Sequence, residues 1–296
     1  MSPTRPSNRL RVEPPSDRPL IDRSLVDPTR RRFCAAVPAL GLSLVGGNLL
    51  AGYASPPTTP PALRHAVVPF SAAGEGRAVA DGWRPYVMRP DRIKTVYETV
   101  RRDGLTVLHA TADSSSSGMH CSVDIDPLTT PWLRWQWRVD ALSDQATVAD
   151  DDAEDTPARL VVAFGGDMDR LSLRDRIFFE QVEVFTGNVL PFATLTYVWD
   201  GQLPVGSVLP YRRSGRIRYQ VVESGARRAG RWLAYERNVL EDYAKVFGEP
   251  PSGHVLGVGL LTDSDDLKNH AEAWYGDIAF EAVRTLADAP VGASPG

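Results

Sequence analysis

The sequence predicts a mainly β fold, an antiparallel β-sandwich or jelly roll with one or two short helices. About ten short segments alternate between apolar and polar residues, as strands with one buried face do. Few stretches have helical spacing, whereas a parallel α/β sheet would need a helix between most of its strands. The chain has 296 residues, of which 43% are hydrophobic, so it can bury a core.

The strands follow from alternation and from the turns between them. Residues 94–100 and 105–111 flank Asp103-Gly104, a pair typical of a hairpin turn. Residues 132–140 alternate strictly, and the apolar run 160–164 suits a central strand. The other predicted strands are 119–125, 193–199, 215–223, 231–238, 254–262 and 271–281.

Two helices are predicted, at residues 173–184 and 238–247. The second ends at Gly248, and Pro250 and Pro251 follow, which is a recognisable stop signal.

Residues 1–54 have the features of a twin-arginine-type export signal. Thr29–Phe33 contains the arginines of that pattern, and an apolar stretch follows from Cys34 to about Leu50. Small residues precede Ser55 at the positions that a signal peptidase reads, so we expect cleavage there and a periplasmic or secreted protein. The alternative is a membrane anchor that is never cut, although the stretch is short and glycine-rich for a span.

The rest of the chain divides into three parts. Residues 55–65 form a Pro-rich linker, 66–285 a single β-sandwich domain, and 286–296 a disordered tail. No second linker or internal repeat interrupts the domain, and no other stretch could span a membrane once the signal is removed.

Composition and motifs exclude several classes of protein. The net charge of −4 argues against nucleic acid as a partner. Two cysteines cannot build a disulfide framework, and the five histidines show no paired zinc spacing. The serine-hydrolase elbow and the glycine patterns of nucleotide sites are missing from the sequence.

The segment Pro131–Val139, which reads Pro-Trp-Leu-Arg-Trp-Gln-Trp-Arg-Val, resembles a strand of the bacterial domain-of-unknown-function family 3047 (DUF3047). The resemblance extends from about Trp83 to Phe280. It also includes Ala158–Phe164, Tyr197–Trp199, Arg237–Val239, Asp242-Tyr243, Phe247–Pro250, Asp263–Asp266 and Ala273–Ile278. It implies an exported bacterial β-rich domain and no known activity. The architecture is similar to that of galactose-binding and other carbohydrate-binding sandwiches, a likeness of fold alone.

The polar strand faces are candidates for ligand binding. In residues 132–140 we expect Trp135 and Trp137 in the core and the alternate residues outside. Arginine forks and amides at such positions could bind a hydroxyl-rich or anionic ligand in a shared groove. The candidate residues are Arg134, Gln136, Arg138, Arg216, Arg218, Gln220, Trp132 and Tyr275. The alternative is a solvated sheet face whose arginines pair with Asp and Glu.

Two acidic runs suggest a structural calcium ion, because calcium binds several carboxylate and carbonyl oxygens. They are Asp150–Asp155 and Asp263–Asp266, and the candidate ligands are Asp263, Asp265, Asp266 and Asp277. A solvated acidic loop is the other interpretation, and no cofactor is required.

These observations predict an exported, non-catalytic envelope domain that binds carbohydrate, such as an envelope polysaccharide, on an Arg/Gln-rich sheet face. One alternative is a lyase-like enzyme on the same face, with His120 or Tyr275 as the base. The other is a structural or protein-binding domain.

Overall fold

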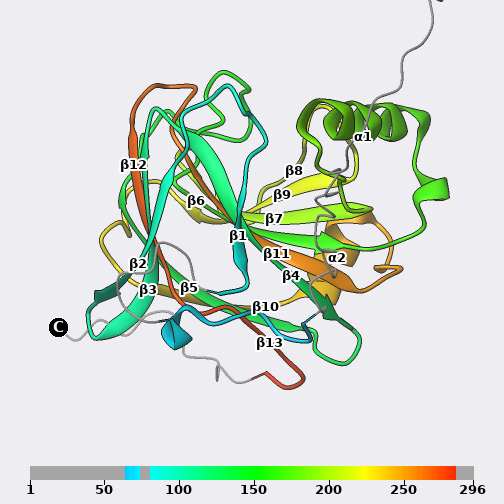
Figure 1. The fold of residues 1–296 in the computed structure, drawn as a ribbon, viewed down its shortest axis with the longest axis horizontal. Helices are drawn as coiled ribbons and strands as arrows, with labels where there is room; N and C mark the ends of the chain where they lie inside the picture. Colours follow the sequence, from blue (N-terminus) through cyan, green and yellow to red (C-terminus); the bar gives the residue numbers. More distant parts are fainter. Residues whose placement is uncertain (1–63, 74–80, 285–296) are drawn as a thin grey trace, which may run out of the picture. The chain divides into compact units, whose positions relative to one another are not determined.

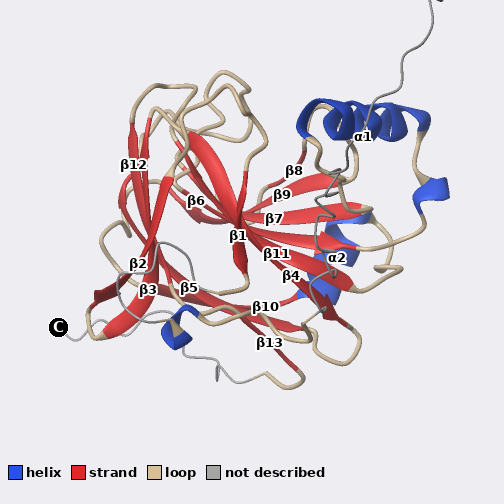
Figure 2. Cartoon of the chain, viewed as in Figure 1, coloured by secondary structure: helices blue, strands red, loops and turns tan. Residues whose placement is uncertain are grey.

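Strands make up most of the regular secondary structure, and Figure 2 shows them as red arrows. The structure is a computed structural model that describes residues 64–73 and 81–284 (Figure 1). The predicted export signal, the linker up to residue 63 and the tail at 286–296 lie outside the described residues.

Seven strands form the first sheet, in the order β1-β4-β11-β6-β7-β9-β8. Neighbouring strands are antiparallel except for β7 and β9, which run parallel. The strands are β1 (Trp83–Tyr86), β4 (Ser116–Ile125), β11 (Val255–Asp263), β6 (Ala158–Phe164), β7 (Ala193–Asp200), β9 (Ile217–Ser224) and β8 (Val208–Pro210).

The second sheet has the order β10-β5-β12-β3-β2, and β13 pairs with the beginning of β5. All its pairs are antiparallel. The strands are β10 (Leu233–Asn238), β5 (Trp132–Ala141), β12 (His270–Tyr275), β3 (Leu105–Asp113), β2 (Val96–Arg102) and β13 (Ala279–Glu281). Asp103 and Gly104 have φ of 53° and 81°, as a tight β2–β3 hairpin turn requires.

Two α-helices, α1 (Leu173–Thr186) and α2 (Val239–Phe247), accompany the short 3-10 helices η1 (Phe70–Ala72) and η2 (Met168–Arg170). The Ser172 side chain caps α1, and Gly248, with φ of 78°, ends α2 as predicted. Among the described residues, no helix has the length and apolar character needed to cross a membrane.

Aromatic rings join the two sheets in the core. Trp135 lies 5.1 Å from Tyr197 of the first sheet and 4.9 Å from Tyr235, measured between ring centroids. Trp137 is fully buried beside them, 5.7 Å from Trp135. These contacts confirm the predicted sandwich and the predicted inward face of β5.

Two short strands were not predicted. Both β1 and β8 lie at the edges of the first sheet, and each contains a proline, Pro85 or Pro210. Proline cannot donate a ladder hydrogen bond, so it is tolerated at an edge but weakens the strand pattern in the sequence.

The predicted outward position of Tyr275 is wrong. Its side chain is 1% exposed, and its hydroxyl lies 2.7 Å from Thr262 Oγ1 and donates to the Leu261 carbonyl at 2.9 Å. The expected strand 271–281 is in fact two strands separated by residues 276–278. The sequence prediction counted alternation through that break as if the strand were continuous, and it therefore assigned Tyr275 to the wrong face.

Replacing Trp137 with alanine should lower the free energy of unfolding by about 3–5 kcal/mol, because it leaves a large cavity between the sheets. Urea unfolding followed by fluorescence measures the loss. The control Leu128→Ala, at a side chain that is 75% exposed, should change it by less than about 0.5 kcal/mol. Similar losses in both variants would contradict this account of the core.

Candidate functional site

Four predicted ligand-binding residues share the outer face of β5. Trp132, Arg134, Gln136 and Arg138 lie there because the alternate residues from 133 to 139 are buried in the core. We call these four residues the β5 strip. Its ends are about 20 Å apart along the strand.

A hollow of about 310 Å³ opens in the middle of the β5 strip. It is lined by Arg134, Trp135, Gln136, Ala234, Tyr235, Asp277 and Ala279. Gly276 closes over Gln136 so tightly that an added Cβ would lie 2.4 Å from Gln136 Cγ. The backbone N–H of Gly276 also donates to the Gln136 carbonyl at 2.9 Å. These contacts fix the position of Gln136 at the hollow.

Carboxylates accompany both arginines of the strip. Arg134 Nη1 lies 2.7 Å from Glu281 Oε1, and its Nε lies 4.0 Å from Glu236. Arg138 Nε lies 2.5 Å from Asp140 Oδ1. The strip therefore carries paired charges, as the alternative interpretation of a solvated face expected, rather than an excess of positive charge.

An aromatic stack that the sequence analysis missed adjoins the Arg138 end of the strip. Trp274 pairs with Arg138 across the sheet, and its ring lies 3.7 Å from that of His109 and 3.8 Å from the Arg102 guanidinium. His109 Nε2 lies 2.8 Å from Glu272 Oε1. The sequence did contain a signal for this stack, because alternation places His109 on the same strand side as Thr111 and Glu272 on the same side as Trp274. Extending the second of these strands past Gly276 obscured that signal.

The second group of predicted ligand residues lies in the other sheet, so the expectation of one shared groove is wrong. Gln220 is 2% exposed, and its Nε2 donates to Asp242 Oδ1 at 3.4 Å. Arg216 Nη1 lies 2.9 Å from Glu249, and Arg218 Nε donates to the Gly215 carbonyl at 3.0 Å. The physical reason is that residues of α2 cover this face of β9. The polar side chains on this face of β9 therefore pair with protein groups.

Neither base of the lyase alternative faces the β5 strip. His120 lies on β4 in the first sheet, where burial lowers the pKa of its imidazole. Tyr275 faces the core, where burial raises the pKa of its hydroxyl. The structure therefore does not assemble the predicted lyase site.

The predicted calcium ligands separate into different places. Asp265 and Asp266 meet Asp155, with one carboxylate oxygen from each lying within 4.8 Å of the others. Asp277 is bound elsewhere, where it accepts from the Ser71 backbone N–H at 2.9 Å. Its inclusion as a shared ligand is wrong, because it belongs to the turn between β12 and β13. The sequence analysis had placed Asp155 in a separate acidic run.

Positive and polar groups already compensate this acidic cluster. Arg92 Nε lies 3.1 Å from Asp265 Oδ2, and Arg92 Nη2 lies 3.8 Å from Asp266 Oδ1. Asp155 accepts from the backbone N–H groups of Asp266 at 3.0 Å and Leu267 at 2.6 Å. Burial and the neighbouring carboxylates raise the pKa of Asp266. Calcium at this place remains a prediction.

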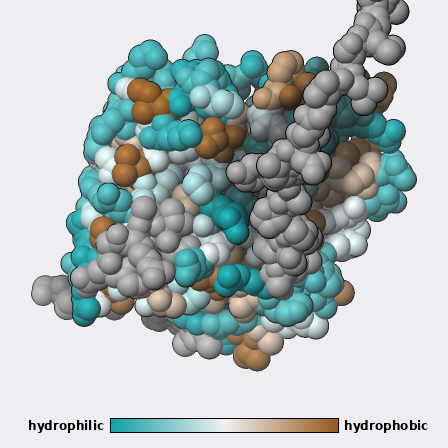
Figure 3. Space-filling model, in the orientation of Figure 1, coloured by the Kyte–Doolittle hydropathy of each residue, from teal (hydrophilic) through white to brown (hydrophobic). Residues whose placement is uncertain are grey.

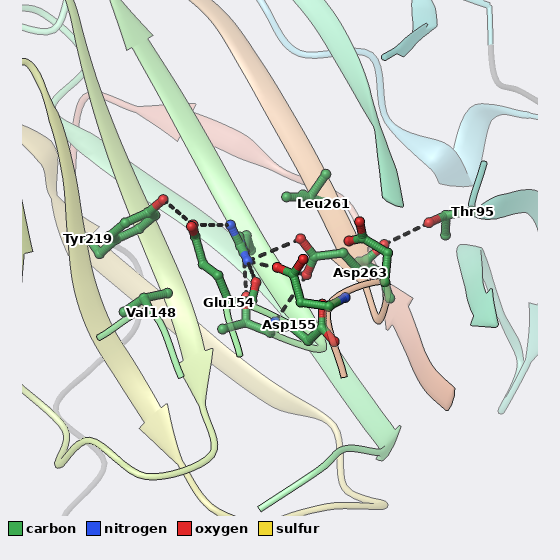
Figure 4. A network of polar contacts seen from close by, with 12 residues as sticks. Thr95, Val148, Glu154, Asp155, Tyr219, Leu261 and Asp263 are labelled. Carbon is green, nitrogen blue, oxygen red and sulfur yellow. Dashed lines mark hydrogen bonds and ion pairs between the residues drawn. The ribbon is translucent and has the colours of Figure 1, made fainter. Parts of the chain in front are cut away.

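A buried arginine organises the adjoining network (Figure 4). Arg159, 5% exposed, lies 3.1 Å from both Glu154 Oε1 and Asp263 Oδ2. Tyr219 donates to Glu154 at 2.5 Å, and the Thr156 N–H donates to Asp263 at 3.0 Å. Burial raises the pKa of Asp263 well above its usual range, by more than the Arg159 charge lowers it. Asp263 is thus committed to this network rather than to the cluster.

The fold and the strip define a β-sandwich with a polar hollow on the outer face of one sheet. The chain belongs to the family described as "Protein of unknown function (DUF3047)", whose model matches residues 81–279. This confirms the resemblance seen in the sequence. The chain matches no curated protein.

Three solved structures share low similarity with the chain. The enzymatically active domain of bacteriophage CBA120 tailspike protein 4 is 10% identical with a TM-score of 0.33, over 71% of this chain and 21% of that chain. A loop-swap mutant of Necallimastix patriciarum Xyn11A is 13% identical with a TM-score of 0.30, over 73% and 94%. A mutant of ENZbleach xylanase is 9% identical with a TM-score of 0.32, over 74% and 84%. At these values none of them bears on what this chain binds.

Calcium titration distinguishes a cation site from a cluster neutralised by Arg92. We expect little change in the melting temperature of the wild type and a rise of a few degrees in Arg92→Ala, which removes the competing guanidinium. Arg89→Ala, at a more exposed arginine, is the matched control. A rise in the wild type equal to that in Arg92→Ala would contradict the role of Arg92 and support the calcium site.

The substitution Asp263→Asn should make the protein progressively more stable than the wild type as the pH rises from about 4 to 7. The pKa of Asp263 is higher in the folded state than in the unfolded state. As the pH rises between these two pKa values, the folded state therefore loses stability relative to the unfolded state. Asparagine keeps the acceptor for the Thr156 N–H but cannot ionise. Urea unfolding at several pH values measures the difference, and the exposed Asp152→Asn is the control. A difference that is constant with pH would contradict the direction of the shift.

Proposed function

We propose that this protein is an exported, non-catalytic carbohydrate-binding protein, and that the β5 strip binds a neutral, hydroxyl-rich glycan. The convergence of Arg134, Gln136 and Asp277 on one hollow carries the proposal. The predicted export signal supports a location in the periplasm or outside the cell, where envelope polysaccharide is one ligand of this class.

The polar groups around the hollow match the needs of sugar hydroxyls. The Arg134 guanidinium and the Gln136 amide N–H groups can donate to hydroxyl oxygens. Both oxygens of the Asp277 carboxylate accept from Ser71, and each keeps a second lone pair that can accept from a hydroxyl proton. The volume of about 310 Å³ is at the lower end of small-molecule sites, which suits one sugar ring. The small side chains of Ala234 and Ala279 keep the hollow open.

The charges favour a neutral glycan over an anionic one. Glu281 neutralises Arg134, and Asp140 neutralises Arg138. Asp277 adds a further negative charge at the hollow. A polyanion would have to displace these carboxylates, whereas neutral hydroxyls can bond to both partners of each ion pair.

An array of neutral glycans (xylan, mixed-linkage β-glucan and dextran) and the polyanion alginate tests the proposal with the full chain. We expect at least one neutral glycan to bind and alginate to bind more weakly. Gln136→Ala should weaken binding about fivefold, because it removes one hydrogen bond of about 1 kcal/mol. Ala234→Tyr should abolish binding by filling the hollow.

The matched control is Gln145→Ala, an exposed glutamine outside the hollow. Binding that survives Ala234→Tyr unchanged, or that is strongest for alginate, would refute the assignment of the hollow. Failure to bind any glycan would refute the carbohydrate proposal and favour a structural or protein-binding role.

A further inference from the structure

Helix α1 is apolar on two opposite sides. Its inner side buries Phe178 and Phe179. On the other side Leu173, Ile177 and Val184 are 74%, 47% and 80% exposed, and their spacing of four and seven residues places them on one line. A surface helix of a globular domain normally carries polar residues on that line.

The apolar surface continues around the last turn of the helix and past its end. Phe185, one residue and about 100° around the helix from Val184, is 80% exposed, and Val189, beyond the end of α1, is 72% exposed. We call Leu173, Ile177, Val184, Phe185 and Val189 the α1 ridge. Brown and tan residues appear in Figure 3 in the upper right of the molecule, where Figure 1 places α1. A group of exposed large apolar side chains of this size indicates an interaction surface.

Arginines gather on one flank of the α1 ridge. A hollow of about 340 Å³ there is lined by Arg174, Ile177, Phe178, Gln181, Arg212 and Arg213. The Arg213 guanidinium lies 4.8 Å from the Phe178 ring, and its Nη2 donates to Gln181 Oε1 at 3.3 Å. Arg174 donates to the Arg212 carbonyl, and Arg212 pairs with Asp151. Three guanidiniums therefore surround an apolar floor.

We propose that the α1 ridge and this arginine hollow dock the protein on an anionic phospholipid bilayer. The ridge inserts among the acyl chains at the interface, and the guanidiniums of Arg174 and Arg213 bind lipid phosphates. A helix that exposes a line of apolar residues beside cations suits a fluid interface, which adapts to its shape.

The charged residues of α1 determine how the helix is rotated about its own axis on the bilayer. By helical spacing, Glu183 lies on the side of α1 opposite Arg174, and Glu180 lies close to the line of the ridge, between Ile177 and Val184. The exposed Arg176 lies between the two glutamates and offsets one of their charges. The flank with Arg174 and Arg213 is therefore the more positive one, and attraction to anionic lipid tilts it toward the surface. This docking surface uses none of the residues of the β5 strip, so the two proposals can fail separately.

A fluorescent probe on the ridge of the full chain tests the docking. An environment-sensitive dye is attached to Val184→Cys in a chain that also carries Cys34→Ser, because the remaining Cys121 is buried. Vesicles of phosphatidylcholine with about 30% phosphatidylglycerol should shift its emission to the blue, and about 0.5 M salt should reduce the shift. The same dye at Leu128→Cys, an equally exposed apolar position, is the control and should not respond.

Substitution of the arginines tests the electrostatic part. Arg174→Gln combined with Arg213→Gln should weaken binding to the anionic vesicles at least tenfold, while the near-ultraviolet circular dichroism stays unchanged. Equal responses at residues 184 and 128, no response to anionic vesicles, or equal binding to pure phosphatidylcholine would overturn the proposal. A shift that depends on protein concentration without vesicles would also overturn it, and would indicate a second copy of the chain as the occupant.

Discussion

Burial of two neighbouring indoles on β5 is the constraint on which the rest of the arrangement depends. Trp135 and Trp137 project into the core, where they pack against Tyr197 of the opposite sheet and Tyr235 of β10. Because side chains alternate along a strand, this packing forces Trp132, Arg134, Gln136 and Arg138 onto the outer face. A shift of one residue in register would bury the arginines and expose the indoles, which explains how the core holds the polar strip in place.

A second constraint comes from charge. The segment between β5 and β6 has no regular secondary structure, and its acidic end is held by the buried Arg159 through Glu154. Asp263 binds the same guanidinium from the end of β11, so the segment and the strand are tied together. Arg92 compensates the adjoining Asp265. A run of carboxylates that looks like a cation site in the sequence is largely used to position the chain.

The two proposed surfaces belong to different parts of the sandwich. The β5 strip lies on the outer face of the six-stranded sheet, and α1 is part of the connection between β6 and β7 of the seven-stranded sheet. A protein with these two surfaces could hold a neutral glycan while it rests on a bilayer. That combination suits the cell envelope, where polysaccharide and membrane lie close together. The two hollows share no lining residue, so a substitution in one leaves the lining side chains of the other in place.

Local spacing in the sequence was enough to predict the fold class, the end of α2 at Gly248 and the inward face of β5. The family was predicted from the resemblance of segments such as Pro131–Val139 and is confirmed by the family model. Alternation also grouped Arg216, Arg218 and Gln220 correctly on one face of a strand. It could not tell that α2 covers this face, or that Asp277 lies apart from Asp265 and beside Arg134 and Gln136. Periodicity states which residues share a side, whereas only the packing of distant elements decides what that side meets. For the same reason the hollow, the neutralisation of Asp265 by Arg92 and the exposed ridge of α1 were decided by the tertiary structure alone.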